Sequence, residues 1–333
     1  MLKKLEVYEN DPMVKLVILK GNGKAFCAGG DIIAVFHFIN AGHWSFGANF
    51  YRKQLTLDYL LGTYKKPLVS LINGMVMGGG AGLSMHARFR IVTENTVFAM
   101  PEASIGHFPD VGASHFLSRL PGFFGEYLGL TGARLDGYEM LACGLATHFI
   151  LSKDLVLLEN ALHVMGPSDI STISQIINKF EHKVNIKQDS AYSRLKIINK
   201  VFSRDTVEEI LSSLENFAAN QAEKWMIEAI NSMKSASPTG LKLFLKSIRE
   251  GRMQKLEQCL VREFNIFCHI MRRTINSDFF EGTRAMLIDK DKRPKWEPSK
   301  LELISEEMVS RCLSEVDDDD DWESLQLPVR SRL

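Results

Sequence analysis

The sequence predicts an α/β protein with a mostly parallel sheet in front and a helical region behind it. Short apolar runs alternate with helical periodicity over residues 1–150, and strands that alternate with helices favour a parallel sheet. After Asp136 few strand patterns remain and helical patterns dominate. The 333 residues, 45% hydrophobic and 24% charged, are typical of a globular protein with two domains, or one α/β domain with an appendage.

The individual elements follow from local patterns. Runs rich in apolar and β-branched residues predict strands at Val14–Leu19, Pro67–Ile72, Phe89–Thr93 and Thr96–Ala99, the first two closed by Gly/Asn turns. Helical periodicity predicts helices at Asp31–Asn40, Gly47–Leu61, Gly82–Ala87, Leu155–Met165, Thr206–Asn216, Ala219–Met233, Gly240–Glu250 and Lys255–Thr274. Ser237-Pro238-Thr239 is typical of a helix start, with Ser237 or Thr239 as the cap.

Charge and composition exclude several classes of function. Forty Lys and Arg balance forty Asp and Glu, so the basic excess of a nucleic-acid-binding protein is lacking. No run of about 18 apolar residues predicts a membrane-spanning helix. The five scattered cysteines form no metal-binding spacing, so we expect no metal.

Three clusters carry the candidate chemistry. Residues 24–31 (KAFCAGGD) and 74–82 (GMVMGGGAG) each lead from a strand to a helix, and residues 100–110 (MPEASIGHFPD) hold Glu102 and Asp110. Glycine loops that enter helices present free N–H groups, and two such loops can aim at one oxygen as an oxyanion hole. Each cluster alone is also typical of a structure without catalytic function, namely a plain turn or a solvated carboxylate. Their combination within residues 24–110 indicates a site.

Other nucleotide and nucleophile motifs fail on single residues. Leu83 stands where the dinucleotide fingerprint needs its third glycine. His86 stands where a nucleophile elbow around Ser84 needs glycine. We therefore interpret Ser84 and His86 as structural.

The three clusters, with LTGARLDGYEMLACGLATHF and SDFFEGTRAMLIDKDKRPKW further on, resemble segments of the crotonase (enoyl-CoA hydratase/isomerase) superfamily. Within it, the chain is similar to the 3-hydroxyisobutyryl-CoA hydrolase family of the plant peroxisomal type. The resemblance implies a crotonase-type ββα spiral core over residues 1–150. A helical C-terminal region would span residues 151–315, and an acidic flexible tail with a targeting tripeptide would span residues 316–333.

The resemblance also implies roles for residues in the clusters. Gly30 and Gly79 would form the oxyanion hole, and Glu102 and Asp110 would lie at the reacting centre. The residues expected to bind substrate are Ala28, Gln54, Gly79, Glu102, His107 and Asp110. Gln54 replaces a glutamate of some members, and His107 replaces a common leucine. No cofactor is implied, because CoA is part of the substrate.

The reaction expected from this resemblance is hydrolysis of an acyl-CoA thioester. Hydratases use two glutamates, but Gly82 stands at the first position and only Glu102 is kept. Asp110 stands where hydratases usually have glycine, as in the hydrolases. Most specifically, we expect conversion of 3-hydroxyisobutyryl-CoA and water to 3-hydroxyisobutyrate and CoA in valine catabolism. Glu102 acts either as general base or as nucleophile.

A second hypothesis is a catalytically weakened acyl-CoA-binding protein or a structural relative. It arises because the chain starts later than the family pattern, without the leading strand and the N-A-L-type segment that precede the helix ending at Met1–Asn10. A truncated sequence, a natural short form and a weakened enzyme all fit this.

The terminal Ser331-Arg332-Leu333 resembles a peroxisomal address of the SKL type. We therefore expect peroxisomal localisation, with an import receptor as partner. By analogy with the superfamily, we expect a homo-oligomer, and we expect neither nucleic acid nor membrane as partner.

Overall fold

Two four-stranded sheets form the front of the molecule in a computed structural model that describes residues 1–164, 169–316 and 322–330. The first sheet is parallel throughout, in the order β1 (Val17–Lys20), β3 (Leu68–Ile72), β5 (Phe89–Val92) and β8 (His148–Phe149). The second has the order β2 (Ala25–Cys27), β4 (Met75–Met77), β6 (Val97–Ala99) and β7 (Leu135–Asp136), with β7 antiparallel to β6.

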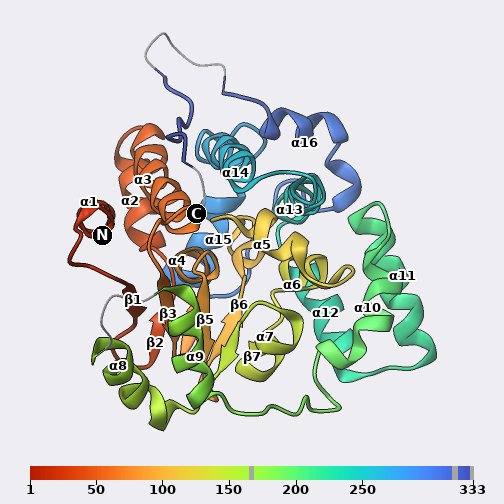
Figure 1. Cartoon of the computed structure of the whole chain (residues 1–333). Coiled ribbons are helices and arrows are strands. Elements are labelled where there is room, and N and C mark those ends of the chain that lie inside the picture. Colours follow the sequence, from red (N-terminus) through yellow and green to blue (C-terminus); the bar gives the residue numbers. More distant parts are fainter. Residues whose placement is uncertain (165–168, 317–321, 331–333) are drawn as a thin grey trace.

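From β1 to β6, consecutive strands belong to different sheets, and this alternation creates the spiral. Three successive pairs, β1 with β2, β3 with β4 and β5 with β6, each give one strand to either sheet. Helical segments return the chain after each pair: α2 (Ile32–Ala41) and α3 (Ser45–Gly62), then α4 (Gly79–Met85), then the 3-10 helix η1 (Glu102–Ile105). Each repeat therefore brings a strand end and the start of a helix to the same region (Figure 1).

Helices make up most of the chain after β6, and Figure 1 shows α10 and α11 at the edge of the molecule, away from the sheets. The remaining α-helices are α1 (Leu2–Asn10), α5 (Ala113–Phe116), α6 (Phe124–Thr131), α7 (Gly137–Cys143), α8 (Leu155–Val164), α9 (Ile170–Phe180), α10 (Leu195–Phe202), α11 (Val207–Asn220), α12 (Lys224–Ser235), α13 (Pro238–Gly251), α14 (Leu256–Met271), α15 (Asp278–Thr283) and α16 (Glu306–Leu313). Short helical segments are η2 (Leu117–Arg119), η3 (Ser152–Asp154), η4 (Tyr192–Arg194), the π-helical η5 (Arg284–Ile288) and η6 (Leu301–Leu303).

One hydrophobic core joins the sheets to the helices behind them. It contains Ile72 and Val92 at the ends of sheet strands together with Phe244 of α13 and Phe264 of α14, all buried. Every residue of β3 is buried, which explains its unbroken apolar sequence apart from Ser70. The back helices are thus packed against the sheet region, and α3 lies along α14 at this junction.

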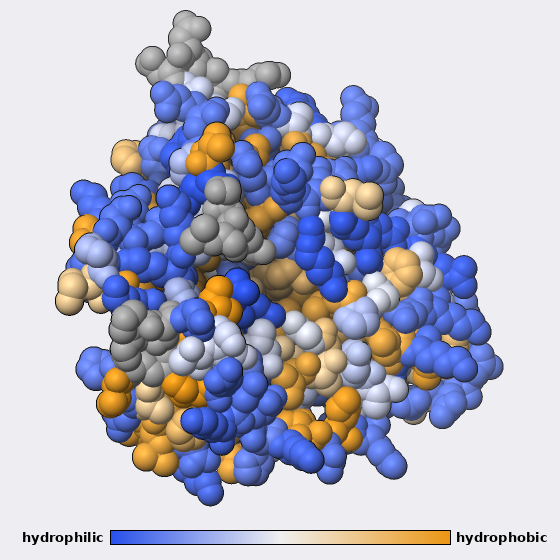
Figure 2. Space-filling view, in the orientation of Figure 1, coloured by the Kyte–Doolittle hydropathy of each residue, from blue (hydrophilic) through white to orange (hydrophobic). Residues whose placement is uncertain are grey.

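The surface is mainly hydrophilic on the face drawn in Figure 2, with apolar side chains gathered in its central hollow and at its lower edge. Val156 and Leu157 of α8 are examples of exposed apolar residues. None of the helices within the described ranges is long and apolar enough to cross a bilayer.

The predicted elements are largely confirmed, but other elements were missed and one boundary differs. β2, β4, β7 and β8 were missed, because strands of two or three residues show too little of a pattern. The missed helices are α5, α6, α7, α9, α10, α15 and α16. α4 begins at Gly79 rather than Gly82, since glycine offers no helical signal by itself. Ser237 caps α13 as expected, accepting a hydrogen bond of 3.0 Å from the Gly240 N–H.

Residues 322–330 pack against the front of the molecule. Trp322 lies 4.4 Å from Trp44 between ring centroids, and Leu325 is buried. Arg330 forms an ion pair of 2.5 Å with Glu9 of α1. The aspartates 317–321 and the tripeptide 331–333, named above as tail features, lie outside the described residues.

We predict that Gly106→Ala destabilises the protein strongly. Gly106 has φ +75°, and a Cβ there would lie 2.0 Å from the backbone oxygen of Asp278. Gly144→Ala is the matched control, because φ is +88° but nothing lies within 4 Å of the added Cβ. In urea unfolding, the control should lose about 1–2 kcal/mol from its backbone conformation alone. The Gly106 variant should lose at least about 2 kcal/mol more; equal losses would contradict the close contact.

Candidate active site

One cavity of about 420 Å³ lies where the helix starts of the spiral converge. Its walls come from the β2–α2 loop, α3, the β4–α4 turn and η1 with the loop after it, closed by Phe267 and Phe279 from the back helices. The predicted residues that line it are Ala28, Gly30, Gln54, Gly79, Glu102, His107 and Asp110. The structure therefore brings every predicted site residue to one cavity.

The two glycine loops touch each other on one side of this cavity. A Cβ built on Gly79 would lie 3.2 Å from Gly29 Cα and 3.5 Å from Gly30 N. Gly29 itself has φ +100°, which favours glycine. Gly79 is the first residue of α4, so its N–H has no partner within that helix. The close approach brings the Gly30 and Gly79 N–H groups into the same region of the cavity.

Glu102 begins η1 directly after Pro101 and is buried. Its Oε1 faces the second glycine loop, 2.8 Å from where a Cβ on Gly78 would stand. Its Oε2 has no hydrogen-bond partner among the described residues. Burial, followed by the negative charge of Asp110, raises the pKa of Glu102 well above its usual range. Such a carboxyl accepts a proton more readily than a solvated one.

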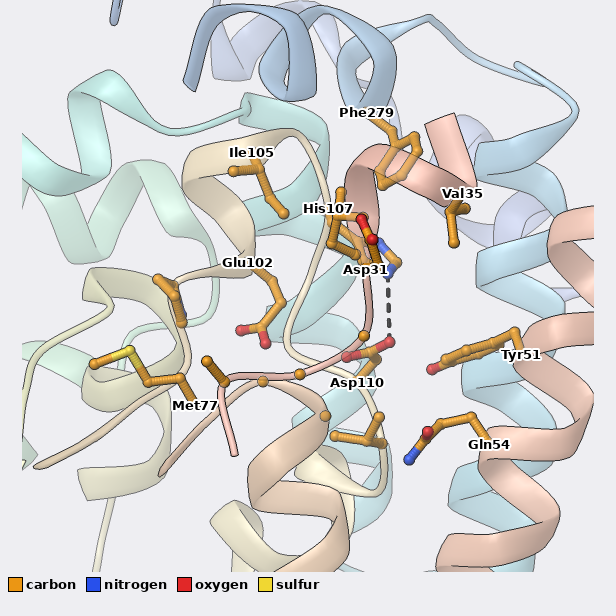
Figure 3. A pocket seen from close by; sticks show the side chains of 18 of the residues that line it. Asp31, Val35, Tyr51, Gln54, Met77, Glu102, Ile105, His107, Asp110 and Phe279 are labelled. Carbon is orange, nitrogen blue, oxygen red and sulfur yellow. Dashed lines mark ion pairs between the residues drawn. The ribbon is translucent and has the colours of Figure 1, made fainter. Parts of the chain in front are cut away.

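Asp110 lies across the cavity from Glu102 and pairs with His107 (Figure 3). The distance from His107 Nε2 to Asp110 Oδ2 is 3.3 Å, and both side chains are buried. The imidazole is held edge-on by Phe108, Phe267 and Phe279, with centroids 4.9–5.7 Å away. This packing fixes the imidazole, which in turn orients the Asp110 carboxylate.

The backbone after Asp110 is strained. Val111 has φ +55°, an outlier for a β-branched residue, and Gly112 follows with φ +85°. The buried carboxylate of Glu263 on α14 holds this turn, accepting hydrogen bonds from Gly112 N at 2.6 Å and Ser114 Oγ at 2.6 Å. Glu263 was not predicted, because only the fold brings position 263 beneath a loop at position 112.

α3 presents polar side chains to the cavity region at helical spacing. Tyr51 and Gln54 line the cavity, and Asp58 lies one turn further along, fully buried. Gln54 Nε2 donates to Asp58 Oδ1 at 3.0 Å, and burial raises the Asp58 pKa well above its usual range. Sequence reasoning missed Tyr51 and Asp58, although the 51, 54, 58 spacing in an apolar helix was a usable signal.

Ser84 and His86 have structural roles, as expected. Ser84 Oγ donates to Gly80 O at 2.9 Å within α4. His86 Nε2 lies 3.1 Å from Val111 O and helps to hold the strained turn. Neither residue lines the cavity. Within the described residues, no group of three or more His, Cys, Asp or Glu side chains could hold a metal ion.

Comparison with known proteins places this geometry in a family. A sequence model described as "Enoyl-CoA hydratase/isomerase" matches residues 1–313. The chain belongs to the enoyl-CoA hydratase/isomerase family. A solved structure described as a carnitinyl-CoA dehydratase from Mycobacterium thermoresistibile aligns with a TM-score of 0.86 at 31% identity, over 98% of this chain and 89% of that one. The fold expected from the resemblance is thereby confirmed.

Two curated relatives from Arabidopsis thaliana represent different kinds of family member. The protein named 3-hydroxyisobutyryl-CoA hydrolase 1 is 56% identical over 98% of this chain and 85% of its own length. The protein named small ribosomal subunit protein mS47 is 42% identical over 99% of this chain and 81% of its own length. The hydrolase is the more similar of the two.

Gly82 stands at the position where the resemblance predicts the first glutamate of a hydratase, and the structure leaves no room for a side chain there. A Cβ on Gly82 would lie 2.7 Å from Val111 Cβ and 3.0 Å from Asp58 Oδ2. The side chains of α3 and the strained turn therefore fill the space that a residue at position 82 would need. A glutamate at position 82 would require both Val111 and the Asp58 side chain to move.

Glu263 should make stability depend on pH. Burial raises its pKa from 4.5 to about 7 in the folded protein. Between these values the folded state binds more protons than the unfolded state, so stability falls as pH rises from about 4.5 to about 7. We predict that Glu263→Gln removes about 3 kcal/mol of this change.

Urea unfolding of both proteins at about pH 5 and about pH 8 measures this difference. The exposed Glu302→Gln serves as control and should keep the wild-type pH dependence. An unchanged slope in Glu263→Gln would contradict the assignment.

Proposed function

We propose that the protein hydrolyses 3-hydroxyisobutyryl-CoA to 3-hydroxyisobutyrate and CoA, a step in valine catabolism. The observation that carries this is the 56% identity, over 98% of the chain, to a protein named 3-hydroxyisobutyryl-CoA hydrolase 1. The cavity agrees with it, because Glu102 and Asp110 face each other while position 82 is glycine. A lone glutamate suits addition of water to a thioester better than hydration of a double bond.

In the proposed mechanism, the thioester carbonyl oxygen binds between the N–H groups of Gly30 and Gly79. Negative charge develops on this oxygen during attack, and fixed N–H donors stabilise it. Asp110 orients the water or the hydroxyl of the acyl group, and Ala28, Gln54 and His107 complete the substrate pocket. Water, two donors and a carboxylate suffice for this chemistry, so we propose no metal or redox cofactor; CoA is part of the substrate.

Glu102 can act as a general base or as a nucleophile, and both routes lead to the same products. As general base it takes a proton from water, the oxygen attacks the carbonyl carbon, and the proton passes to the departing CoA thiolate. As nucleophile its oxygen attacks first, CoA leaves, and water cleaves the resulting anhydride. Both roles need the deprotonated carboxylate. The raised pKa of Glu102 therefore predicts activity that increases as pH rises through that pKa.

We predict that Glu102→Gln lowers CoA release by about 10²–10⁴-fold while the protein stays folded. Glutamine keeps the shape of the side chain but cannot accept the proton or form the anhydride. CoA release from 3-hydroxyisobutyryl-CoA is followed with a thiol reagent, and circular dichroism checks the fold. Turnover close to wild type would refute the assignment of Glu102.

Isotopic labelling separates the two roles. A single turnover in ¹⁸O-water, followed by mass spectrometry of the peptide that contains Glu102, reports where the oxygen goes. Label in Glu102 establishes the anhydride route, because only attack of water on the Glu102 carbonyl of the anhydride places it there. Label confined to the product acid indicates attack of water on the acyl carbonyl, either of the thioester or of the anhydride.

A binding or structural role is the second candidate, favoured by the 42% identity to a protein named small ribosomal subunit protein mS47. The retained Glu102, Asp110 and paired glycine loops argue against it. Tight binding of acyl-CoA esters without thiol release would favour a binding protein. A homo-oligomer remains part of the proposal, and light scattering during gel filtration tests it.

We further propose that the protein is peroxisomal and that an import receptor binds Ser331, Arg332 and Leu333. The support is the similarity of this tripeptide to an SKL-type address. We predict that a fluorescent protein fused ahead of residue 1 labels peroxisomes. Deletion of the last three residues should disperse the label, and Leu333→Lys should have the same effect. Unchanged peroxisomal label in the deletion would refute this address.

A further inference from the structure

Tyr51 is a buried cavity residue to which nothing above assigns a role. Its ring stacks on Phe267 of α14, with a centroid distance of 4.0 Å and an interplanar angle of 16°. On the same helix, Phe264 lies parallel to it within 5°, at 6.5 Å. Aromatic packing therefore fixes the ring and the direction of its hydroxyl.

The Tyr51 hydroxyl points into the cavity beside Asp110 (Figure 3). It is buried and makes no hydrogen bond of normal length and angle among the described residues, although the Asp110 carboxylate and the Val111 backbone lie close enough to affect its pKa through hydrogen bonding. A buried polar group without a partner destabilises a protein by about 1–3 kcal/mol. Such groups are therefore rare unless they have a functional role or bind a ligand or water. The hydroxyl therefore faces both the cavity and the Asp110 carboxylate, so a molecule bound there can contact the two groups together.

The chemistry on either side limits what that molecule can be. Burial, followed by the negative charge of Asp110, raises the pKa of Tyr51 well above 10, so the phenol keeps its proton and can donate. Asp110 Oδ2 lies 3.3 Å from His107 Nε2, which leaves Oδ1 to accept from a bound group. A group that contacts both Tyr51 and Asp110 must accept from one and donate to the other. An aliphatic hydroxyl does both, as water does, whereas a carbonyl only accepts and a methyl group does neither.

The polar side chains next to this pair have partners of their own: His107 pairs with Asp110, and Gln54 Nε2 donates to Asp58 Oδ1. Val35 and Phe279 add apolar surface to the cavity wall, and Ile105 adds more on the side of Glu102. In such surroundings a hydroxyl is favoured only where both of its hydrogen bonds can form.

We propose that Tyr51 and Asp110 bracket the hydroxyl of the acyl group, Tyr51 donating and Asp110 accepting. Tyr51 is then a specificity-determining residue that selects hydroxylated acyl-CoA esters over their unsubstituted counterparts. This inference rests on the proposed function, because it names the acyl feature that the same site recognises.

Tyr51→Phe tests the inference, because phenylalanine keeps the ring stack and loses only the hydroxyl. We expect kcat/KM for 3-hydroxyisobutyryl-CoA to fall about tenfold, as for loss of one hydrogen bond to a buried group. For isobutyryl-CoA, which has no such hydroxyl, kcat/KM should stay unchanged or rise. Tyr59→Phe is the matched control, since Tyr59 is buried on the same helix and does not line the cavity. It should leave the ratio of the two kcat/KM values unchanged.

Affinity separates failure of this inference from failure of the proposed function. Calorimetry with uncleavable thioether analogues of the two CoA esters gives their relative Kd values without any turnover. A selectivity ratio that falls in Tyr51→Phe but not in Tyr59→Phe supports the inference, even if wild type proves inactive. If Tyr51→Phe weakens binding of both analogues equally, or leaves both Kd values unchanged, the ratio of the Kd values stays as in wild type and the inference is overturned.

Discussion

The contact between the two glycine loops is the constraint on which the site depends. Gly29 and Gly79 approach so closely that a Cβ on either would lie 3.2–3.3 Å from the other loop's backbone. The spiral makes this contact possible, because β2 and β4 are neighbours in one sheet and each leads to a helix start. Every other group in the cavity is arranged around the region where these two N–H-bearing loops meet.

Beside the glycine loops, the site concentrates buried acidic groups. Glu102, Asp110, Asp58 and Glu263 are all buried, and burial, with a smaller contribution from the charge of Asp110, raises the pKa of the other three. Such a cluster opposes full ionisation, since like charges in a poorly solvated region repel. The protein tolerates it through hydrogen bonds from Gln54, Ser114 and Gly112, and through the imidazole of His107. Proton acceptors near the reacting centre are therefore kept more basic than they are in water.

The sequence predicted the fold class, the helices α2–α4, α8 and α11–α14, and the cavity residues, because those signals are local. Glycine loops after strands, and the carboxylates after Met100-Pro101, are visible within a few residues of each other. Tyr51, Asp58 and Glu263 were missed because their significance depends on packing between α3, α14 and the strained turn at Val111. β2 and β4 were missed for a different reason, since these short strands are defined by their pairing in the second sheet rather than by their own residues.

The packing of residues 322–330 has a practical consequence for handling the protein. This segment contacts α1 through Arg330. Its Trp322 ring stacks parallel to Phe264 of α14, with an interplanar angle of 2°. Phe264 in turn faces Tyr51 in the cavity. A shortened version ending near residue 315 would lack Trp322, so Phe264 would lose its stacking partner and the cavity wall at Tyr51 would be less well supported. For purification or crystallisation, the minimal unit therefore extends to Arg330.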